Sequence, residues 1–451
     1  MAFVTRSRTS LWARQQLIPR PSSSLLFYSC SWNNSISGLP KSSTIPFKQF
    51  SSSVDSSPPP FKYVPIEEVE RLEKYQPGGY HPILIGDVLQ SRYRVAHKLG
   101  YGAYSTTWLC RDYQSNSYVA VKVGTADSND REVDILDYLN DSTPFAHPGK
   151  KMISSIKDRF VLHGPNGTHP CYVTTLAMCS VSGAKEGSYK RIFQDTTARS
   201  LIVQILLAVE YIHGKGVVHG ASEPVIRFDG QPLEPGVPSS VVPPIWLGKA
   251  SEEFSLSESR VFLSDFGEAY RPSTENRYSS HAPMSFMPPE ARFEPEGGLS
   301  FSADIWTLAC SIWIILGQRP LFEEILATPD DIIAEQVDTR GKLPLQWWEK
   351  WAARHEYFDE SGNPNKSRHV RSWEDRFEKH IQLPRQQAGI PIFEVEEKAA
   401  VMDMLRAMLS FEPEKRPTAQ GILKCEWMER WAIPDFEKSY FGQSRGSTEI
   451  S

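Results

Sequence analysis

The sequence predicts an α+β fold of two lobes, in which a small antiparallel β lobe precedes a larger, mainly helical lobe. Three observations predict it. Short alternating segments crowd between residues 93 and 123, segments with helical spacing dominate after residue 196, and 451 residues suffice for two lobes with tails. The cleft between the lobes is the expected binding site.

The composition supports a folded core and excludes several functional classes. Hydrophobic residues make up 40% of the chain and charged residues 23%. The net charge is −5, but residues 1–54 contain six Lys or Arg and no Asp or Glu, so the remainder carries −11. This acidic body argues against nucleic acid as a direct partner and is compatible with a basic substrate. The six cysteines form no CxxC pair, which argues against a zinc ribbon.

The N-terminal residues differ from the rest of the chain. Residues 1–54 are rich in Arg and Ser, a composition typical of a mitochondrial transit peptide; a disordered basic tail is the alternative. The most apolar run, residues 308–317, is too short to span a bilayer and predicts a buried helix. We therefore divide the chain into a leader or tail (1–54), a linker (55–92), a small lobe (93–180), a large lobe (181–435) and a C-terminal tail (436–451).

The elements follow from local periodicity. Residues 93–99, 105–111 and 117–123 predict three antiparallel strands with tight turns, with a helix over 129–139 and another strand over 172–177. Residues 197–213 carry apolar side chains at helical spacing. Further helices are expected over residues 302–316, 345–353, 395–410 and 418–426.

A glycine-rich turn and a lysine follow one another on these strands. Glycines at Gly100 and Gly102 would let the backbone approach phosphates, although a plain hairpin turn explains them equally well. Lys122 ends the apolar run Val119-Ala-Val-Lys and needs an anionic partner. Glu132 at the start of the next helix is the preferred candidate, and Asp134 competes with it.

The second half of the chain carries four more signals in a fixed order. Asp265 begins an Asp-Phe-Gly tripeptide after an apolar entry, and a carboxylate there would hold Mg²⁺. Glu290 ends a Pro-Pro-Glu element, Asp304 opens the most apolar helix, and Arg416 is a candidate partner for Glu290. Their order after the glycine turn and lysine makes chance improbable.

Over residues 93–431 the sequence resembles a eukaryotic protein kinase domain and, more narrowly, the SR-protein-kinase family. The run of residues 99–109, with Ser-Thr-Thr-Trp108 after the glycines, and Asp304-Ile-Trp-Thr-Leu-Ala-Cys310 carry the narrower resemblance. It implies ATP, Mg²⁺ and transfer to Ser or Thr of protein substrates, typically Arg/Ser-rich splicing proteins. It also implies a monomer, in the nucleus or cytoplasm unless residues 1–54 direct it to mitochondria. The implied ATP-binding residues are Leu99, Gly100, Tyr101, Gly102, Ala103, Tyr104, Ser105, Thr107, Ala120, Lys122 and Glu132.

The catalytic loop departs from the family pattern. Laid on His219, the pattern HxDxxxxN requires Asp at position 221 and Asn at position 226, where this chain has Ala221 and Ile226. The Asp would orient the substrate hydroxyl and accept its proton, and the Asn would hold a second Mg²⁺. Asp229 is close in sequence but out of frame by eight positions. A genuine pseudokinase or a lost stretch of sequence explains the break, and we favour the lost stretch because the other motifs are intact.

Three functions compete. The first is an ATP-dependent Ser/Thr protein kinase, which the nucleotide-site motifs favour. The second is a catalytically dead ATP-binding scaffold, which Ala221 and Ile226 favour. The third is a small-molecule phosphotransferase, suggested by His219-Gly220 but opposed by Glu290, Asp304 and Arg416. We predict a protein kinase by family, with the turnover of this chain in doubt.

Overall fold

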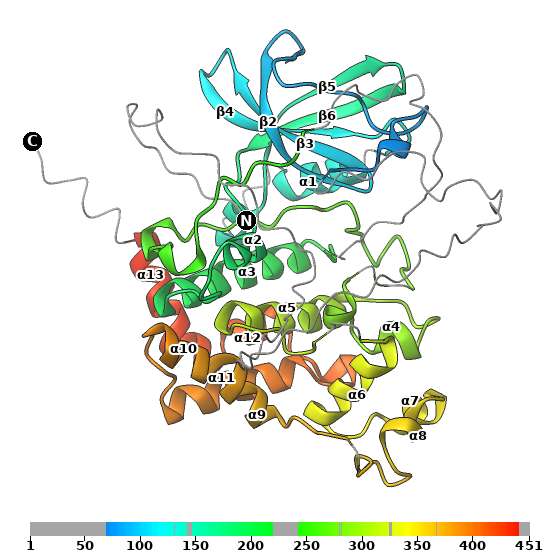
Figure 1. The fold of residues 1–451 in the computed structure, drawn as a ribbon, viewed down its shortest axis with the longest axis vertical. Coiled ribbons are helices and arrows are strands. Elements are labelled where there is room, and N and C mark those ends of the chain that lie inside the picture. The colour runs from blue at the N-terminus through cyan, green and yellow to red at the C-terminus, as the bar shows by residue number, and fades with distance from the viewer. Residues whose placement is uncertain are drawn as a thin grey trace, which may run out of the picture.

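The computed structural model describes residues 69–129, 131–141, 147–219, 242–278, 280, 282–323, 327–366 and 368–441. It confirms the predicted α+β fold of two lobes. Figure 1 shows the twisted sheet of the small lobe above the helices of the large lobe, with α1 between them. Strand β6 ends at Thr175 and helix α2 begins at Val181, so residues 176–180 connect the lobes.

The small lobe is a six-stranded antiparallel sheet in the order β1-β2-β3-β4-β6-β5. The three predicted strands are β2, β3 and β4, and helix α1 buries Ile135, Leu136 and Leu139. The bounds are β1 (Val88–Leu89), β2 (Tyr93–Gly102), β3 (Ser105–Asp112), β4 (Ser117–Gly124), α1 (Arg131–Asn140), β5 (Ile156–Gly164) and β6 (Gly167–Thr175).

Two parts of the small lobe differ from the sequence prediction. Strand β5 was not anticipated, because it is an edge strand in which Phe160 is the one buried residue. Residues 69–92 were assigned to a linker, yet they pack on the sheet. Within them the buried Glu70 accepts hydrogen bonds from Tyr75 and from the fully buried Lys98 of β2. The small lobe therefore begins earlier than predicted. The sequence did not indicate this, because a buried polar contact leaves no apolar periodicity.

The large lobe contains the predicted helices and several short ones. Its last helix, α13, continues past the predicted boundary at residue 435. The bounds are α2 (Val181–Glu186), α3 (Asp195–Gly214), α4 (Glu290–Phe293), α5 (Phe301–Leu316), α6 (Pro329–Arg340), α7 (Leu345–Lys350), α8 (Arg354–Tyr357), α9 (Trp373–Phe377), α10 (Leu383–Ala388), α11 (Val395–Met408), α12 (Ala419–Leu423) and α13 (Ile433–Phe441).

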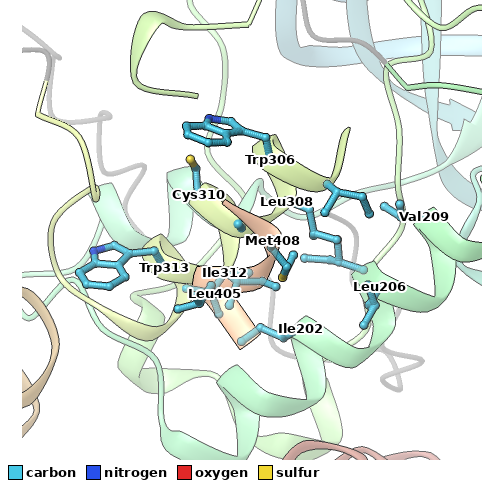
Figure 2. Packing of buried hydrophobic residues seen from close by; sticks show 14 of the residues in the cluster. Ile202, Leu206, Val209, Trp306, Leu308, Cys310, Ile312, Trp313, Leu405 and Met408 are labelled. Atoms are coloured by element: carbon cyan, nitrogen blue, oxygen red, sulfur yellow. The ribbon is translucent and has the colours of Figure 1, made fainter. Parts of the chain in front are cut away.

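The core of the large lobe forms where α3, α5 and α11 meet. Figure 2 shows α3 side chains such as Leu206 beside those of α5 and α11. Trp306 and Trp313 of α5 are fully buried, and Trp313 lies in the most apolar run of the sequence, for which a buried helix was predicted. The rigid packing of these helices fixes the ends of α3 and α5, from which the loops of the cleft depart. No helix in the described ranges is long and apolar enough to cross a membrane.

Candidate nucleotide and phosphotransfer site

The glycine-rich turn is a tight hairpin between β2 and β3. Gly102 pairs with Ser105, so Ala103 and Tyr104 form the turn. A Cβ atom built on Gly100 or Gly102 would meet nothing within 4 Å, so both backbones face open space. The glycines therefore leave room for a ligand to approach the main chain.

Two residues outside the predicted site hold this hairpin. The Tyr80 hydroxyl donates a hydrogen bond of 2.6 Å to the carbonyl of Gly102, and Lys74 Nζ donates one of 3.3 Å to Ala103 O. Sequence analysis missed both, because they lie in the segment assigned to the linker. Burial raises the pKa of the Tyr80 hydroxyl, which therefore stays a donor at neutral pH.

Lys122 and Glu132 form the predicted ion pair across β4 and α1. Lys122 Nζ lies 2.8 and 2.7 Å from the two carboxylate oxygens of Glu132, whereas the competing Asp134 is exposed. Burial alone would lower the pKa of Lys122, but neighbouring groups, including this carboxylate, outweigh it and raise the pKa. Lys122 is therefore a fixed positive charge facing the cleft.

Asp265 brings a second carboxylate to the same lysine. Its Oδ1 lies 3.5 Å from Lys122 Nζ, and its side chain is 70% exposed. The backbone of Asp265 has a φ of 67°, a strained conformation for a residue with a side chain. The next residue, Phe266, is buried and donates its N–H to Glu132 at 3.2 Å. Folding therefore fixes Phe266 and leaves the Asp265 carboxylate exposed beside Lys122.

The loop after α3 is anchored up to His219. The His219 N–H donates to Asp304 Oδ2 at 2.8 Å, and its Nε2 lies 3.1 Å from Ser264 O. Its ring packs edge-on against Phe266 at 5.1 Å between centroids. Asp304 also contacts His213 Nε2 at 3.0 Å. Ala221 and Ile226, which occupy the expected catalytic positions, lie outside the described residues.

The predicted pair of Glu290 and Arg416 is present and buried. The guanidinium binds both carboxylate oxygens, at 2.6 and 2.7 Å. Arg416 also donates to the carbonyls of Ser302 and Ser410 and lies 5.0 Å from the Trp306 ring centroid. This arrangement ties the first residue of α4 to α5 and to the turn before α12.

Comparisons with known proteins agree with this arrangement. The family description "Protein kinase domain" matches residues 254–428. A serine/threonine protein kinase of Aspergillus fumigatus is 28% identical over 387 residues, covering 81% of this chain and 91% of the relative. The serine/threonine-protein kinase SRPK of Physarum polycephalum is 26% identical over 407 residues, covering 80% and 91%. Human SRSF protein kinase 3 is 34% identical over 165 residues, covering 35% and 29%.

The domain match and these relatives support a protein serine/threonine kinase. Two of the relatives, SRPK and SRSF protein kinase 3, bear the names of SR-protein kinases. The remaining residues expected to bind ATP lie around the same hairpin of the kinase. Thr107 of β3 pairs with Lys122, Ala120 is buried in β4, and Leu99, Tyr101 and Ser105 lie on β2 and β3.

A further contact of the kinase was not predicted from the sequence. Arg131, at the start of α1, donates to the carbonyl of Ala269 at 2.9 Å and pairs with Glu275. Glu275 also binds Arg277 at 2.9 Å. These contacts hold the segment after Asp265 against α1. Only the position of Arg131 next to Glu132 signals this contact in the sequence.

Proposed function

We propose that the interlobe cleft binds Mg·ATP as the nucleotide site of an ATP-dependent serine/threonine protein kinase of SR-protein-kinase type. We further propose that phosphate transfer by this chain is at or below detection. The convergence of Lys122, Glu132 and Asp265 carries the first part. The presence of Ala221 in place of a base carries the second.

The residues present fit a nucleoside triphosphate. Open space beside the Cα atoms of Gly100 and Gly102 lets phosphate oxygens approach the main chain of the hairpin. Lys122, held by Glu132, supplies a fixed cation, and the exposed Asp265 carboxylate supplies an oxygen ligand for Mg²⁺. Mg²⁺, when bound, neutralises phosphate charge during transfer.

Transfer itself needs one further group. A bond forms between the substrate hydroxyl oxygen and the γ-phosphorus, the bond to the β-phosphate oxygen breaks, and the hydroxyl proton must be accepted. The methyl group of Ala221 neither orients the hydroxyl nor accepts its proton. Loss of a positioned base costs on the order of 10²–10⁴ in rate. The absence of Asn from position 226 removes a second metal ligand in addition.

A catalytically dead ATP-binding scaffold is the alternative, and the same Ala221 supports it. The two proposals differ in how the catalytic loop was altered: by loss of a stretch of sequence from a kinase, or by gradual decay of its motifs in a scaffold. A lost stretch of sequence explains why the nucleotide side is intact, whereas gradual decay is expected to damage several motifs together. Sequencing the transcript across Gly220 and Ala221 separates them: an additional coding stretch supports the kinase, and its absence supports the scaffold.

Nucleotide binding is tested by thermal unfolding. Millimolar Mg·ATP is expected to raise the melting temperature of the full chain, and Lys122→Ala is expected to abolish that shift. No shift in the unmodified chain contradicts the proposed nucleotide site.

Turnover is tested with radiolabelled ATP and an Arg/Ser-rich peptide, with Asp265→Ala as the background control. We expect incorporation by the unmodified chain to equal that of the control. Robust transfer that depends on Asp265 would show that another residue, such as Asp229, acts as the base. The choice of an Arg/Ser-rich acceptor follows the names of the SRPK-type relatives and the acidic body of the chain.

A further inference from the structure

Residues 242–249, here called the strap, contact both lobes beside the nucleotide cleft. On the small-lobe side the Ile245 N–H donates a hydrogen bond of 2.8 Å to the carbonyl of Lys98. Lys98 directly precedes Leu99 and the glycine-rich hairpin on β2. Val242 also packs against the small-lobe core. The strap is therefore bonded to β2, the strand that leads into the glycine-rich hairpin.

On the large-lobe side the strap is held by Trp246, which packs against the large-lobe core. Its ring covers Gly187, the residue that ends α2. A Cβ atom on Gly187 would lie 2.3 Å from the Trp246 ring, although the φ of Gly187 is an ordinary −73°. The backbone does not require glycine there, so the absence of a side chain serves to seat the indole.

The strap also packs against the connection between the lobes. A Cβ atom on Gly248 would lie 2.6 Å from Cys179 Sγ, so the side chain of Cys179 packs against the backbone of Gly248. Cys179 is one of the residues 176–180 that link β6 to α2. The strap thus provides a second, non-covalent connection between the lobes, beside the covalent connection through residues 176–180.

The far end of the strap is fixed to the large lobe. Lys249 Nζ lies 2.8 and 2.7 Å from the carboxylate oxygens of Glu258, and 5.1 Å from the Phe254 ring centroid. Because this end is anchored and Ile245 is bonded to β2, any opening of the lobes must break the Ile245 bond or unseat Trp246.

We propose that the strap closes the outer edge of the nucleotide cleft and holds the lobes in the nucleotide-binding arrangement. The proposal rests on the nucleotide site proposed above. The strap contacts both places that such a nucleotide would border, the strand that leads into the glycine-rich hairpin and residues 176–180. If the lobes open when the strap is lost, the observed affinity falls by the fraction of molecules that remain closed. Trp246 is then a positioning residue that never touches the phosphates.

The test compares nucleotide affinity with stability in matched variants of the full chain. Calorimetric titration with Mg·ADP is expected to give a dissociation constant about tenfold weaker for Trp246→Ala, equivalent to about 1.4 kcal/mol. Trp431→Ala removes a similarly half-buried tryptophan that packs on the same core far along the chain. It is expected to lower the melting temperature without changing the dissociation constant. Trp246→Phe is expected to bind normally, because the Trp246 Nε1 is buried and has no acceptor within the described ranges.

A second pair of variants tests the seat of the ring. Gly187→Ala is expected to weaken Mg·ADP binding by displacing Trp246, and the double variant with Trp246→Ala is expected to bind no worse than Trp246→Ala alone. Hydrogen exchange in the nucleotide-free chain supplies a readout independent of binding. Trp246→Ala is expected to accelerate exchange over residues 99–107, whereas Trp431→Ala is not.

The outcomes are distinguishable. If the unmodified chain does not bind Mg·ADP, the proposed nucleotide site fails, and with it the role of the strap in binding; unchanged exchange in Trp246→Ala would then overturn the bridging role as well. If the unmodified chain binds and the strap variants bind equally well, the strap proposal alone is overturned. Equal weakening by Trp246→Ala and Trp431→Ala would reduce the effect to general stability and also contradict the proposal.

Discussion

Two neighbouring parts of the site, here called its stronger and weaker walls, hold very different sets of chemical groups. On the stronger wall, built by β4, α1 and the segment at Asp265, the expected charges are present, and Lys122 contacts both Glu132 and Asp265. The weaker wall is the loop after α3, which keeps the anchoring contacts of His219, whereas the sequence has Ala221 in place of the expected base. The contrast shows that a loop can keep the contacts that hold it in place while it loses its catalytic residue.

This separation bears on how the loop was altered. The contacts of His219 with Asp304, Ser264 and Phe266 stabilise the loop whether or not it catalyses. Their retention shows only that the fold is maintained. The ion pair of Lys122 with Glu132 is more informative, because a half-buried lysine next to open cleft space contributes little to folding that an apolar side chain could not. Its retention favours a nucleotide-binding protein.

The largest expected effect comes from repairing the weaker wall. Insertion after Gly220 of a segment that begins with Asp and carries Asn five positions later is expected to raise phosphate transfer by about 10²–10⁴, because it restores the base and the second metal ligand. Ala221→Asp alone is expected to recover little, since the Asn and the loop length remain wrong. Incorporation of radiolabelled phosphate measures both. Equal recovery by the single substitution would contradict our account of the break.

The sequence predicted the stronger wall better than the rest of the small lobe, for a physical reason. Glu132, Asp265 and Lys122 are short-range signals, each tied to a recognisable local pattern, and the fold brings them together as expected. The packing of residues 69–92 depends instead on the buried Glu70 and on hydroxyl groups such as Tyr80, which leave no periodicity to read. The strap could not be predicted from the sequence either. It depends on one backbone hydrogen bond and on two glycines, Gly187 and Gly248, whose contacts Trp246 and Cys179 are distant from them in sequence.

A second test asks whether the large lobe supports both walls. Arg416→Ala leaves the buried carboxylate of Glu290 without its partner, which is expected to cost about 3–5 kcal/mol of unfolding free energy. Arg430→Ala breaks exposed pairs with Glu396 and Glu426 and is expected to cost less than about 1 kcal/mol. Denaturant unfolding followed by fluorescence measures both. Similar losses in the two variants would show that the buried pair is not an anchor.

A third, smaller effect is expected from the scaffold of the weaker wall. Asp304→Asn replaces the charged acceptor of the His219 N–H and is expected to destabilise the chain by about 1.5–3 kcal/mol. Asp403→Asn, at an exposed site on α11 that lies 3.6 Å from Arg406, is the matched control and is expected to be near neutral. If Asp304→Asn is as neutral as its control, the loop has lost its anchoring along with its chemistry, and the comparison between the walls no longer holds.

The smallest expected effect concerns where the folded region begins. A chain starting at Phe61 is expected to melt at the same temperature as the full chain, because residues 1–54 lack any core pattern and residues 51–62 are rich in Ser and Pro. A chain starting at Tyr93 is the informative counterpart. It loses Glu70 and leaves the fully buried Lys98 ammonium without its carboxylate, so it is expected to melt at a markedly lower temperature. It also loses Tyr80, which holds the glycine-rich hairpin, so Mg·ADP binding is expected to weaken together with stability. A chain starting at Tyr93 that is as stable as the one starting at Phe61 would restore the predicted boundary at residue 92 and remove residues 69–92 from the account of the stronger wall.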